Sequence, residues 1–444
     1  MVRRSIVSSA AGTALEWYEF YLYGAAAALV FNKLFFPGYD PVAGTLLAFA
    51  TYAFGFGARP LGAVLAGHYG DRIGRRNTLV VTITLTFIAT ALIGALPTHA
   101  QVGVLAPILL VLMRLLQGIG LGGEWAGGAL NIAERVAPRW RGFLASFVQV
   151  GAPIGSLLST GVLLLFSVML TEGQFLGWGW RIPFLLSAVI GAVALYIRFR
   201  LTETPVFEQS AKENRHPVRS PVSVAVRKAH RQILRVIGIR FGADIVYYTA
   251  AVFSITYVTQ YLKLDQSVVL NALLVAGIVN IVVYPLSAAL SDQIGRRRVT
   301  IAGGVLSLIW AFAYFPMLDT KVGWVIAFAV VSGMVCNGIM YGLQAAWISE
   351  LFDTEIRYSG ASIGYQMTSL VGGGIAPFVA AGLLYWFDSS WPVVGYVVVA
   401  VLLTLYTVVT SPETVGRDLS TPYHQGVGER EVGVPKVATA PGVE

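Results

Sequence analysis

The sequence predicts an all-α membrane protein with twelve transmembrane helices in two six-helix pseudo-repeats. Three observations support this fold class: an apolar composition, apolar runs of membrane-spanning length, and motifs that occur once in each half. Of the 444 residues, 56% are hydrophobic and only 12% are charged, whereas soluble proteins average about 25% charged residues. A soluble chain of this length could not bury ten or more apolar segments of about 20 residues each.

The apolar runs divide the chain into two halves. They lie at about 8–32, 43–67, 78–97, 104–132, 142–170 and 180–199, and again at 236–260, 267–290, 299–318, 322–348, 359–386 and 391–410. The polar break between them is rich in Lys, Arg and Pro, and the last residues are rich in Gly, Pro and Val without any period. We therefore predict a first bundle at 1–200, a cytoplasmic linker at 201–235, a second bundle at 236–414 and a disordered cytoplasmic tail at 415–444.

Two motifs indicate an internal duplication. GHYGDRIGRR at 67–76 returns as SDQIGRRR at 291–298, so that Asp71 and Asp292 are 221 residues apart. A Glu and an Arg seven residues apart recur 216 residues later, as Glu134 with Arg141 and Glu350 with Arg357. Gln149 and Gln366 form a third such pair. Two halves of the same orientation are expected to meet at a binding cavity near the bilayer midplane.

Basic residues fix the expected orientation. They gather in alternate turns, at Arg72, Arg75 and Arg76, at Arg135, Arg139 and Arg141, at Arg296, Arg297 and Arg298, and at Arg357. The opposite loops hold only Lys33, Lys263 and Lys321. By the positive-inside rule, both termini and the linker are cytoplasmic. The net charge of +8 is therefore a sign of topology, and we expect no nucleic-acid partner.

Charged residues occur inside the predicted spans, where each costs roughly 2.5–3.5 kcal/mol. They are Glu16, Glu19, Arg114, Glu124, Arg240 and Asp244. Glu16 and Glu19 share one helix face, Arg114, Gln117 and Glu124 share another, and Arg240, Asp244 and Tyr247 form a third stripe. We expect all three stripes to face one water-filled cavity.

The charge balance of that cavity suggests a proton site. Four carboxylates face two arginines, or three if Arg59 is included, so at least one carboxylate is expected to take up a proton in some state. The candidates are Glu19, Glu16 and Asp244. The alternative is a permanent lattice of ion pairs that only holds the helices together, and the i,i+4 spacing of Arg240 and Asp244 allows them to satisfy each other.

Two arginines, one from each half, suit a carboxylate substrate. A guanidinium binds a carboxylate bidentately, which makes Arg114 and Arg240 candidate substrate ligands. Polar and aromatic side chains could line the rest of the site: Tyr18, Gln117, Gln149, Tyr247, Tyr341 and Gln366. For each of these, helix packing or anchoring at the interface is an equally good explanation.

Other motifs exclude enzymatic and ATP-driven functions. The GIGLGG run at 118–123 matches the dinucleotide fingerprint, but it lies inside a predicted span, where small residues for close helix packing explain it better. No GxxxxGK[ST] occurs, the five histidines have no metal-ligand spacing, and no Ser-His-Asp or Cys-His constellation is present. We expect no enzyme activity, no cofactor, no metal and no bound nucleotide.

The chain resembles the metabolite:proton symporter family of the major facilitator superfamily. The resemblance rests on GTALEWYEFYLYG, RPLGAVLAGHYGDRIGRR, RLLQGIGLGGEWAGG, GWGWRIPFL, ETPVFE and ELFDTEIRYSGASIGYQ, which span residues 12–366. Within that family, it is most similar to shikimate-type members. The resemblance implies alternating access and import of a small organic acid with protons across a bacterial plasma membrane, by a monomer.

The resemblance also implies roles for particular residues. By similarity to proton-coupled sugar carriers, Glu19 and Arg114 would form the coupling pair. Asp71, Arg72 and Arg75, with Asp292 and Arg296, would make the inner gate, and the pairs Glu134–Arg141 and Glu350–Arg357 would brace it through exposed contacts. Ser291 stands where the first half has Gly70, which predicts a degraded second gate loop. The rival functions are a proline/betaine-type symporter and, from another class, a membrane sensor that does not transport.

Overall fold

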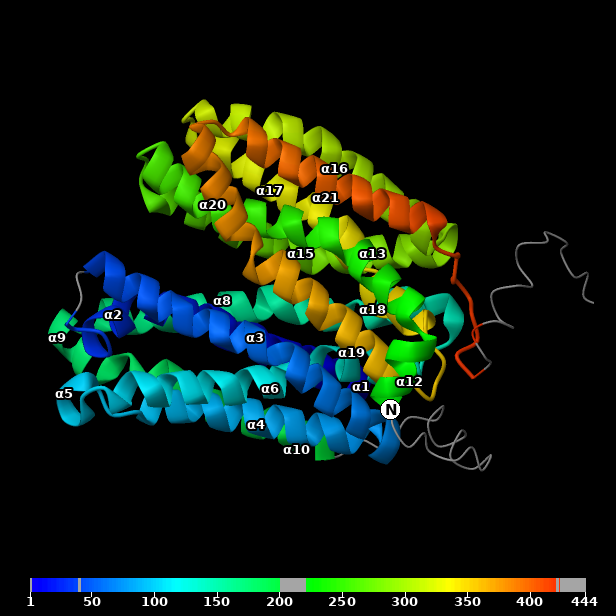
Figure 1. The fold of residues 1–444 in the computed structure, drawn as a ribbon, viewed down its shortest axis with the longest axis horizontal. Coiled ribbons are helices and arrows are strands. Elements are labelled where there is room, and N and C mark those ends of the chain that lie inside the picture. Colours follow the sequence, from blue (N-terminus) through cyan, green and yellow to red (C-terminus); the bar gives the residue numbers. More distant parts are fainter. Residues whose placement is uncertain (1, 39–40, 200–220, 421–422, 424–444) are drawn as a thin grey trace, which may run out of the picture.

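A computed structural model describes residues 2–38, 41–199, 221–420 and 423 of the chain. Within these ranges, every regular element is a helix. The helices form two bundles, one from each half of the sequence, and Figure 1 shows them side by side. The two bundles lie against each other at the end that holds the N-terminus, α12 and α18, and they diverge toward the end that holds α2, α5 and α9.

The first bundle is built from the predicted spans of the first half. Its long helices are α1 (Val2–Ala26), α3 (Pro41–Ile73), α4 (Arg75–Ala95), α6 (Leu105–Ala133), α8 (Phe147–Met169) and α10 (Arg181–Phe199). Short elements join them: η1 (Ala27–Phe31), α2 (Asn32–Leu34), α5 (His99–Val102), η2 (Pro138–Trp140), α7 (Arg141–Ala145), α9 (Glu172–Gln174) and η3 (Phe175–Gly179).

The second bundle repeats this plan. Its elements are α13 (His230–Tyr248), η4 (Thr249–Phe253), α14 (Ser254–Thr256), η5 (Tyr257–Tyr261), α15 (Gln266–Ile294), α16 (Arg296–Asp319), α17 (Gly323–Tyr341), α18 (Gln344–Glu350), α19 (Arg357–Thr368), η6 (Ser369–Gly374), α20 (Ala376–Phe387) and α21 (Trp391–Thr410). The bundles contact each other mainly through α15 on α7 and α8, and through α19 on α3 and α6.

The described residues contain nine helical segments long and apolar enough to cross a membrane, or ten if the bent pair Glu172–Gly179 and Arg181–Tyr196 is one span. The chain is therefore an all-helical, multi-pass membrane protein. The first two predicted spans correspond to α1, with 25 residues, and α3, with 33 residues, which are not among these segments. The twelve-helix count thus remains a prediction for this chain.

The duplicated motif forms the same turn in both halves. Gly74 separates α3 from α4 with φ 109° and ψ 155°, and Gly295 separates α15 from α16 with φ 106° and ψ 150°. Residues with a Cβ rarely adopt this conformation, so glycine is required at both turns. We call the end of the molecule that holds these turns and their arginines the basic end.

Part of the predicted disordered tail is packed on the basic end. Arg417, Leu419 and Tyr423 are only 3%, 2% and 5% exposed, so the prediction of disorder is wrong for these residues. We call Ser411–Ser420 together with Tyr423 the C-terminal strap. The predicted linker lies mostly at 200–220, outside the described residues, and its described part holds α12 (Pro221–Lys228) and the first turn of α13.

The glycines of the GIGLGG run allow close helix packing, as predicted. A Cβ added at Gly118 would lie 2.2 Å from the carbonyl oxygen of Gly55, and one at Gly122 would lie 2.3 Å from that of Arg59. Both contacts join α6 to α3. This close approach fixes α6, and with it Arg114 and Gln117, against the neighbouring helices.

Candidate functional site

Glu19, Gln117 and Arg114 form one buried cluster inside the first bundle. Gln117 donates from Nε2 to the Glu19 carboxylate (2.9 Å) and to Thr90 Oγ1 (2.6 Å), and its Oε1 atom accepts a hydrogen bond from Arg114. The Cζ atom of Arg114 also lies 3.1 Å from the centre of the Tyr23 ring. The predicted coupling pair is therefore brought together, with the Gln117 amide as a bridge.

Glu16 belongs to a second cluster. Its Oε1 atom lies 3.2 Å from Nη1 of Arg59 on α3, and both side chains are buried. The carboxylate also interacts electrostatically with Glu124 and with Arg240. Glu124 itself accepts a hydrogen bond from Thr82 Oγ1 at 3.3 Å. Arg59, which the sequence left as an optional third arginine, is thus the ion-pair partner of Glu16.

Arg240 and Asp244 form the corresponding pair in the second bundle. Arg240 Nη2 lies 3.0 Å from Asp244 Oδ2 and donates to Ser369 Oγ at 3.2 Å. The two residues are 5% and 4% exposed. Within the described part of the chain, Nε and Nη1 of Arg240 have no hydrogen-bond partner. The pair satisfies Asp244 as the i,i+4 spacing predicts, but it leaves much of the guanidinium unused.

An aromatic stack joins Arg240 to the first bundle. The Cζ atom of Arg240 lies 3.4 Å from the centre of the Tyr365 ring. The rings of Trp125 and Tyr365 are stacked with centroids 3.7 Å apart and an interplanar angle of 18°. Tyr341 Oη lies 2.9 Å from Tyr365 Oη. Trp125 comes from α6, so the stack crosses the boundary between the two halves.

Gln149 and Gln366, the paired glutamines of the duplication, both bridge the halves. Gln149 donates from Nε2 to the carbonyl oxygen of Tyr341 (3.2 Å) and accepts from Trp125 Nε1 (2.7 Å). Gln366 donates to the carbonyl oxygens of Leu121 (3.3 Å) and Gly122 (3.2 Å). The Gln149 amide and the NH2 group of Gln366 are thus already used in contacts between the bundles, whereas Oε1 of Gln366 has no hydrogen-bond partner among the described residues.

The two remaining predicted lining residues are tyrosines with different surroundings. Tyr18 is buried, and its hydroxyl donates to the carbonyl oxygen of Pro183 at 2.7 Å, inside the first bundle. The hydroxyl of Tyr247 shares a hydrogen bond with that of Tyr21. The ring of Tyr247 packs against Trp17, with the ring centroids 5.9 Å apart. Tyr247 therefore lies at the boundary between the halves.

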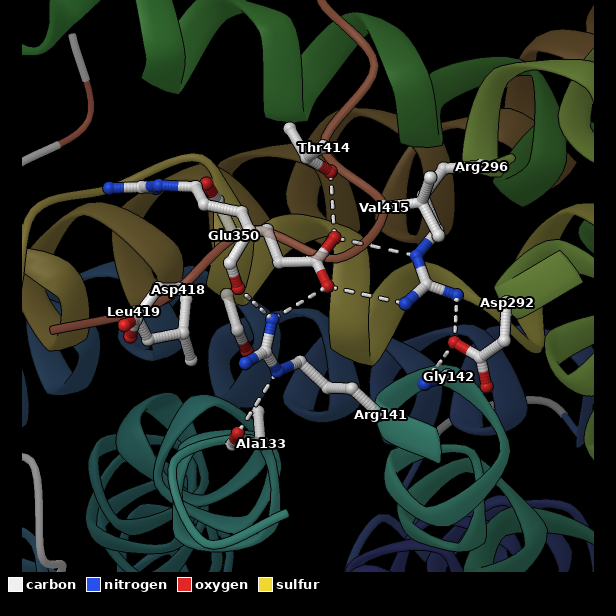
Figure 2. Close-up of polar contacts among 12 residues, drawn as sticks. Ala133, Arg141, Gly142, Asp292, Arg296, Glu350, Thr414, Val415, Asp418 and Leu419 are labelled. Carbon is white, nitrogen blue, oxygen red and sulfur yellow. Dashed lines mark hydrogen bonds and ion pairs between the residues drawn. The ribbon is translucent and has the colours of Figure 1, made fainter. Parts of the chain in front are cut away.

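The gate residues converge at the basic end on Glu350 (Figure 2). Its Oε1 atom lies 3.1 Å from Arg141 Nη1 and 3.2 Å from Arg296 Nη2, and its Oε2 atom accepts from Thr414 Oγ1 at 2.7 Å. Arg296 also pairs with Asp292 at 2.8 Å. One buried carboxylate thus joins an arginine of the first half to an arginine of the second.

The bracing pairs are exchanged between the halves, which corrects the prediction from the sequence. Arg141 pairs with Glu350 instead of Glu134, and Arg357 pairs with Glu134 at 2.9 Å instead of Glu350. None of these four side chains is more than 3% exposed. The predicted exposed contacts are therefore buried, because the two bundles dock over them.

The acid of the second gate loop also bridges the halves. Asp292 accepts hydrogen bonds from the backbone N–H groups of Gly142 (2.8 Å) and Phe143 (2.9 Å), so it caps the first turn of α7. Ser291 Oγ accepts a hydrogen bond from Arg296 Nη1 at 2.6 Å. The second loop is therefore not degraded. In the first loop, Arg72 is exposed, and the side chains of Asp71 and Arg75 lie outside the described part of the structure.

The C-terminal strap, which the sequence did not reveal, ties these residues together. Glu413 accepts from the backbone N–H groups of Arg296 and Arg297 at 3.0 and 3.1 Å, capping α16. Gate arginines of both halves donate to strap carbonyl oxygens, Arg141 to Arg417 (2.8 Å) and Arg357 to Leu419 (2.9 Å). The strap has no periodic pattern, so the only feature of the sequence that could have indicated it is the isolated charged residues after the last span.

Comparison with known proteins agrees with this arrangement. The family profile described as "Major Facilitator Superfamily" matches residues 9–377. The shikimate transporter of Escherichia coli K12 is 41% identical over 408 residues, which cover 91% of this chain and 93% of that protein. The proline/betaine transporter of the same organism is 32% identical over 429 residues, covering 94% of this chain and 85% of that protein.

A solved structure supports the fold. A proton:xylose symporter of the major facilitator superfamily, bound to 6-bromo-6-deoxy-D-glucose, aligns with a TM-score of 0.78 over 94% of this chain and 98% of its own. Its sequence is only 18% identical, so the likeness concerns the fold alone. The family profile and the full-length relatives lead to one conclusion: the chain belongs to the major facilitator superfamily, whose members are membrane transporters and not enzymes.

Proposed function

We propose that the chain is a proton-coupled symporter that imports a small organic acid, such as shikimate or a di- or tricarboxylate, by alternating access. The observation that carries the proposal is the buried guanidinium of Arg240, which has unpartnered Nε and Nη1 atoms among the described residues. A buried donor without a partner costs about 1–3 kcal/mol, or more when charged. A substrate carboxylate that accepts from either atom reduces this cost. The 41% identity to a shikimate transporter supports the same substrate class.

Residue roles follow from the clusters. Arg240 and Arg114 would hold the substrate carboxylate, with Gln117, Tyr247 and Tyr341 beside them. One of Glu19, Glu16 and Asp244 would carry the proton. Gln149 and Gln366 would couple the site to the docking of the halves, because their amides bridge the bundles. Tyr18 would have a packing role, since its hydroxyl is bonded inside the first bundle.

Topology is part of the proposal. With α1 and α3 as the first two spans, the chain would cross the membrane twelve times. The basic end would face the cytoplasm of a bacterium, because the arginine-rich turns lie there. Both termini would then be cytoplasmic, and the closed basic end would correspond to an outward-facing state.

The main rival is a carrier of proline or betaine, which a 32% identical relative suggests. Recognition of a quaternary ammonium group requires open aromatic faces. Here the Tyr365 ring has Arg240 within 3.4 Å of its centre and is stacked on Trp125. A ring already used in this way is a poor wall for an ammonium cage, which favours the acid.

Uptake into proteoliposomes tests the function. With an inwardly directed proton gradient, we expect labelled shikimate, 2-oxoglutarate or citrate to accumulate, and an uncoupler to abolish accumulation. Accumulation of betaine or proline but of none of the acids would support the rival carrier. Binding of an acid without uptake under any gradient would support the sensor. Protein-free liposomes provide the control.

A further inference from the structure

Two buried ion pairs face each other across the boundary between the halves. Glu16 with Arg59 belongs to the first bundle, and Arg240 with Asp244 belongs to the second. The helices that carry these pairs are in contact: Tyr21 on α1 shares a hydrogen bond with Tyr247 on α13, and η6, which packs on α3, places Gly372 against Asp244. Arg240 also acts electrostatically on Glu16. The four charges thus form one electrostatic unit.

Each arginine in this unit is only partly used by its acid. Arg59 meets Glu16 through one nitrogen and one oxygen, and Glu16 Oε2 has no hydrogen-bond partner among the described residues. Arg240 meets Asp244 through Nη2 alone. A guanidinium offers five N–H donors, so single-atom contacts leave both arginines able to bind a further carboxylate.

The charge balance restricts how an anion can enter. Arg59, Arg240, Glu16 and Asp244 sum to zero when all are ionised. Adding one substrate carboxylate makes the unit negative inside the membrane, where an uncompensated charge is costly. Adding one proton together with the carboxylate restores neutrality. Whatever the charge of the neighbouring Glu124, keeping the charge of the site the same in the empty and the loaded state therefore requires one proton for each carboxylate bound.

Glu16 is the group best placed to take that proton. It competes with the incoming carboxylate for Arg59, and protonation ends this competition. The other charged or titratable groups that face Glu16 are Glu124 on α6, Arg240 on α13, Tyr365 on α19 and Glu19 on its own helix. Asp244 keeps its contact with Nη2 of Arg240, because the substrate can accept from the unpartnered Nη1 atom.

We infer that the substrate carboxylate binds between Arg59 and Arg240 and displaces Glu16, which takes up the coupled proton. Glu16 changes from carboxylate to carboxylic acid, and no covalent bond to the substrate forms. This inference rests on the proposed function and deepens it: Arg59 replaces Arg114 as the ligand from the first half, and the preferred substrate is an acid with a single carboxylate. Glu19 with Arg114 then forms a separate cluster that Gln117 holds together.

The test is the pH dependence of substrate affinity in the purified, full-length protein in nanodiscs, with shikimate as the probe. In the wild type, affinity should fall by up to about tenfold per pH unit as Glu16 ionises, since one proton is linked to one anion. In Glu16→Gln, affinity should change by less than about twofold from about pH 5.5 to about pH 8.5. Glu19→Gln should keep the wild-type slope. A slope that survives Glu16→Gln and disappears in Glu19→Gln would overturn the inference.

Further variants guard against misfolding and test the arginine. If Glu16→Gln does not yield folded protein, Glu16→Asp replaces it. Its shorter carboxylate competes less for Arg59, so the substrate affinity at alkaline pH should exceed the wild-type value. An equal or lower affinity would contradict the inference. Arg59→Lys should weaken binding at least about tenfold, because the bidentate fork is lost. Lys33→Gln, in an exposed ion pair with Glu172, should match the wild type.

Failure of this inference is distinguishable from failure of the proposed function. If the wild type accumulates no acid under a proton gradient, the proposed function fails. If it accumulates shikimate but the pH slope does not depend on Glu16, only the assignment of Glu16 and Arg59 fails.

Discussion

The two copies of the gate loop occupy equivalent positions but meet the opposite half through different residues. At the first, which we call the Tyr358 corner, the small residues Gly67 and Gly70 receive Ser359 and Tyr358 of the second half. At the second, which we call the Glu350 corner, Asp292 and Arg296 with Glu350 receive Arg141 and Gly142 of the first half. At the Tyr358 corner the glycine belongs to the gate loop, and at the Glu350 corner it belongs to the facing segment. A buried ion pair between the halves lies at each corner, Arg357 with Glu134 and Arg141 with Glu350.

The position of the glycine explains this difference. Gly70 and Ser291 are equivalent, and so are Gly142 and Tyr358. Wherever one partner is glycine, the facing residue is larger: Tyr358 lies over Gly70, and the loop that holds Ser291 and Asp292 lies over Gly142. Duplicated sequences can thus diverge in the residues that form a contact while keeping a tight fit, provided that the small residue changes sides.

The largest effect is expected for Glu350→Gln, which removes the charge shared by Arg141 and Arg296. Both arginines would remain buried without their common acid, which typically costs about 3–5 kcal/mol. We expect the closed state to lose most of its stability. Hydrogen–deuterium exchange should rise in peptides from α7, α18 and the C-terminal strap. Exposed Glu355 gives the matched control, and Glu355→Gln should leave exchange unchanged. Equal exchange in both variants would show that the Glu350 corner does not hold the gate.

The next effect is expected for Gly142→Ala, which adds a methyl group at the Glu350 corner. The new Cβ would lie 2.6 Å from the carbonyl oxygen of Ala288 and 2.7 Å from Asp292 Oδ1. Overpacking of this kind typically costs about 1–3 kcal/mol. We expect faster exchange at the basic end, with the two bundles themselves intact.

Gly62→Ala is the control for Gly142→Ala, because it distinguishes an effect on the gate from an effect on folding. Its Cβ would lie 2.1 Å from the carbonyl oxygen of Ile119, inside the first bundle. This variant should lower the melting temperature without selectively opening the basic end. If Gly142→Ala lowers the melting temperature as much but leaves basic-end exchange unchanged, its clash acts on folding and not on the gate.

A smaller effect is expected for Ser291→Gly, which makes the second loop match the first. It removes the hydrogen bond from Arg296 to Ser291 Oγ. We expect a loss of about 1.5 kcal/mol, the lower end of the range for a charged donor, because Arg296 keeps Asp292 and Glu350. Uptake should persist with a modest rise in basic-end exchange. A fall in exchange would instead mean that serine at this position weakens the gate, as the sequence alone suggested.

Local spacing explains what the sequence could predict. The i,i+4 rule gave the Arg240–Asp244 pair, the apolar runs gave the helices of both bundles, and each in-span charge named from the sequence is buried. The duplicated IGRR motif gave the two glycine turns, because one backbone conformation requires glycine in both copies. These features depend on residues within one helix or one turn.

The ion pairs between the halves could not be predicted from the sequence, for a physical reason. The choice of Glu350 over Glu134 as the partner of Arg141 depends on how the bundles dock, and Glu134 is the nearer residue in sequence. The pairing of Glu16 with Arg59 depends on the placement of α1 against α3. The position of the C-terminal strap was unpredictable for the same reason. The carbonyl oxygens of Arg417 and Leu419 accept from arginines that come together only when the halves dock.

The smallest effect is expected at the Tyr358 corner, for Tyr358→Phe. The variant keeps the ring that covers Gly70 and removes the hydroxyl, which donates a hydrogen bond to the carbonyl oxygen of Gly123 at 2.8 Å. A neutral hydrogen bond of this kind contributes about 0.5–1.5 kcal/mol. Because this hydrogen bond has a neutral donor, whereas the bond lost in Ser291→Gly has a charged donor, exchange at the basic end should rise less than in Ser291→Gly. Tyr358→Ala, which also removes the ring, should have a much larger effect. Equal effects of the two Tyr358 variants would mean that the hydroxyl, and not the ring, makes the main contribution of Tyr358 to this corner.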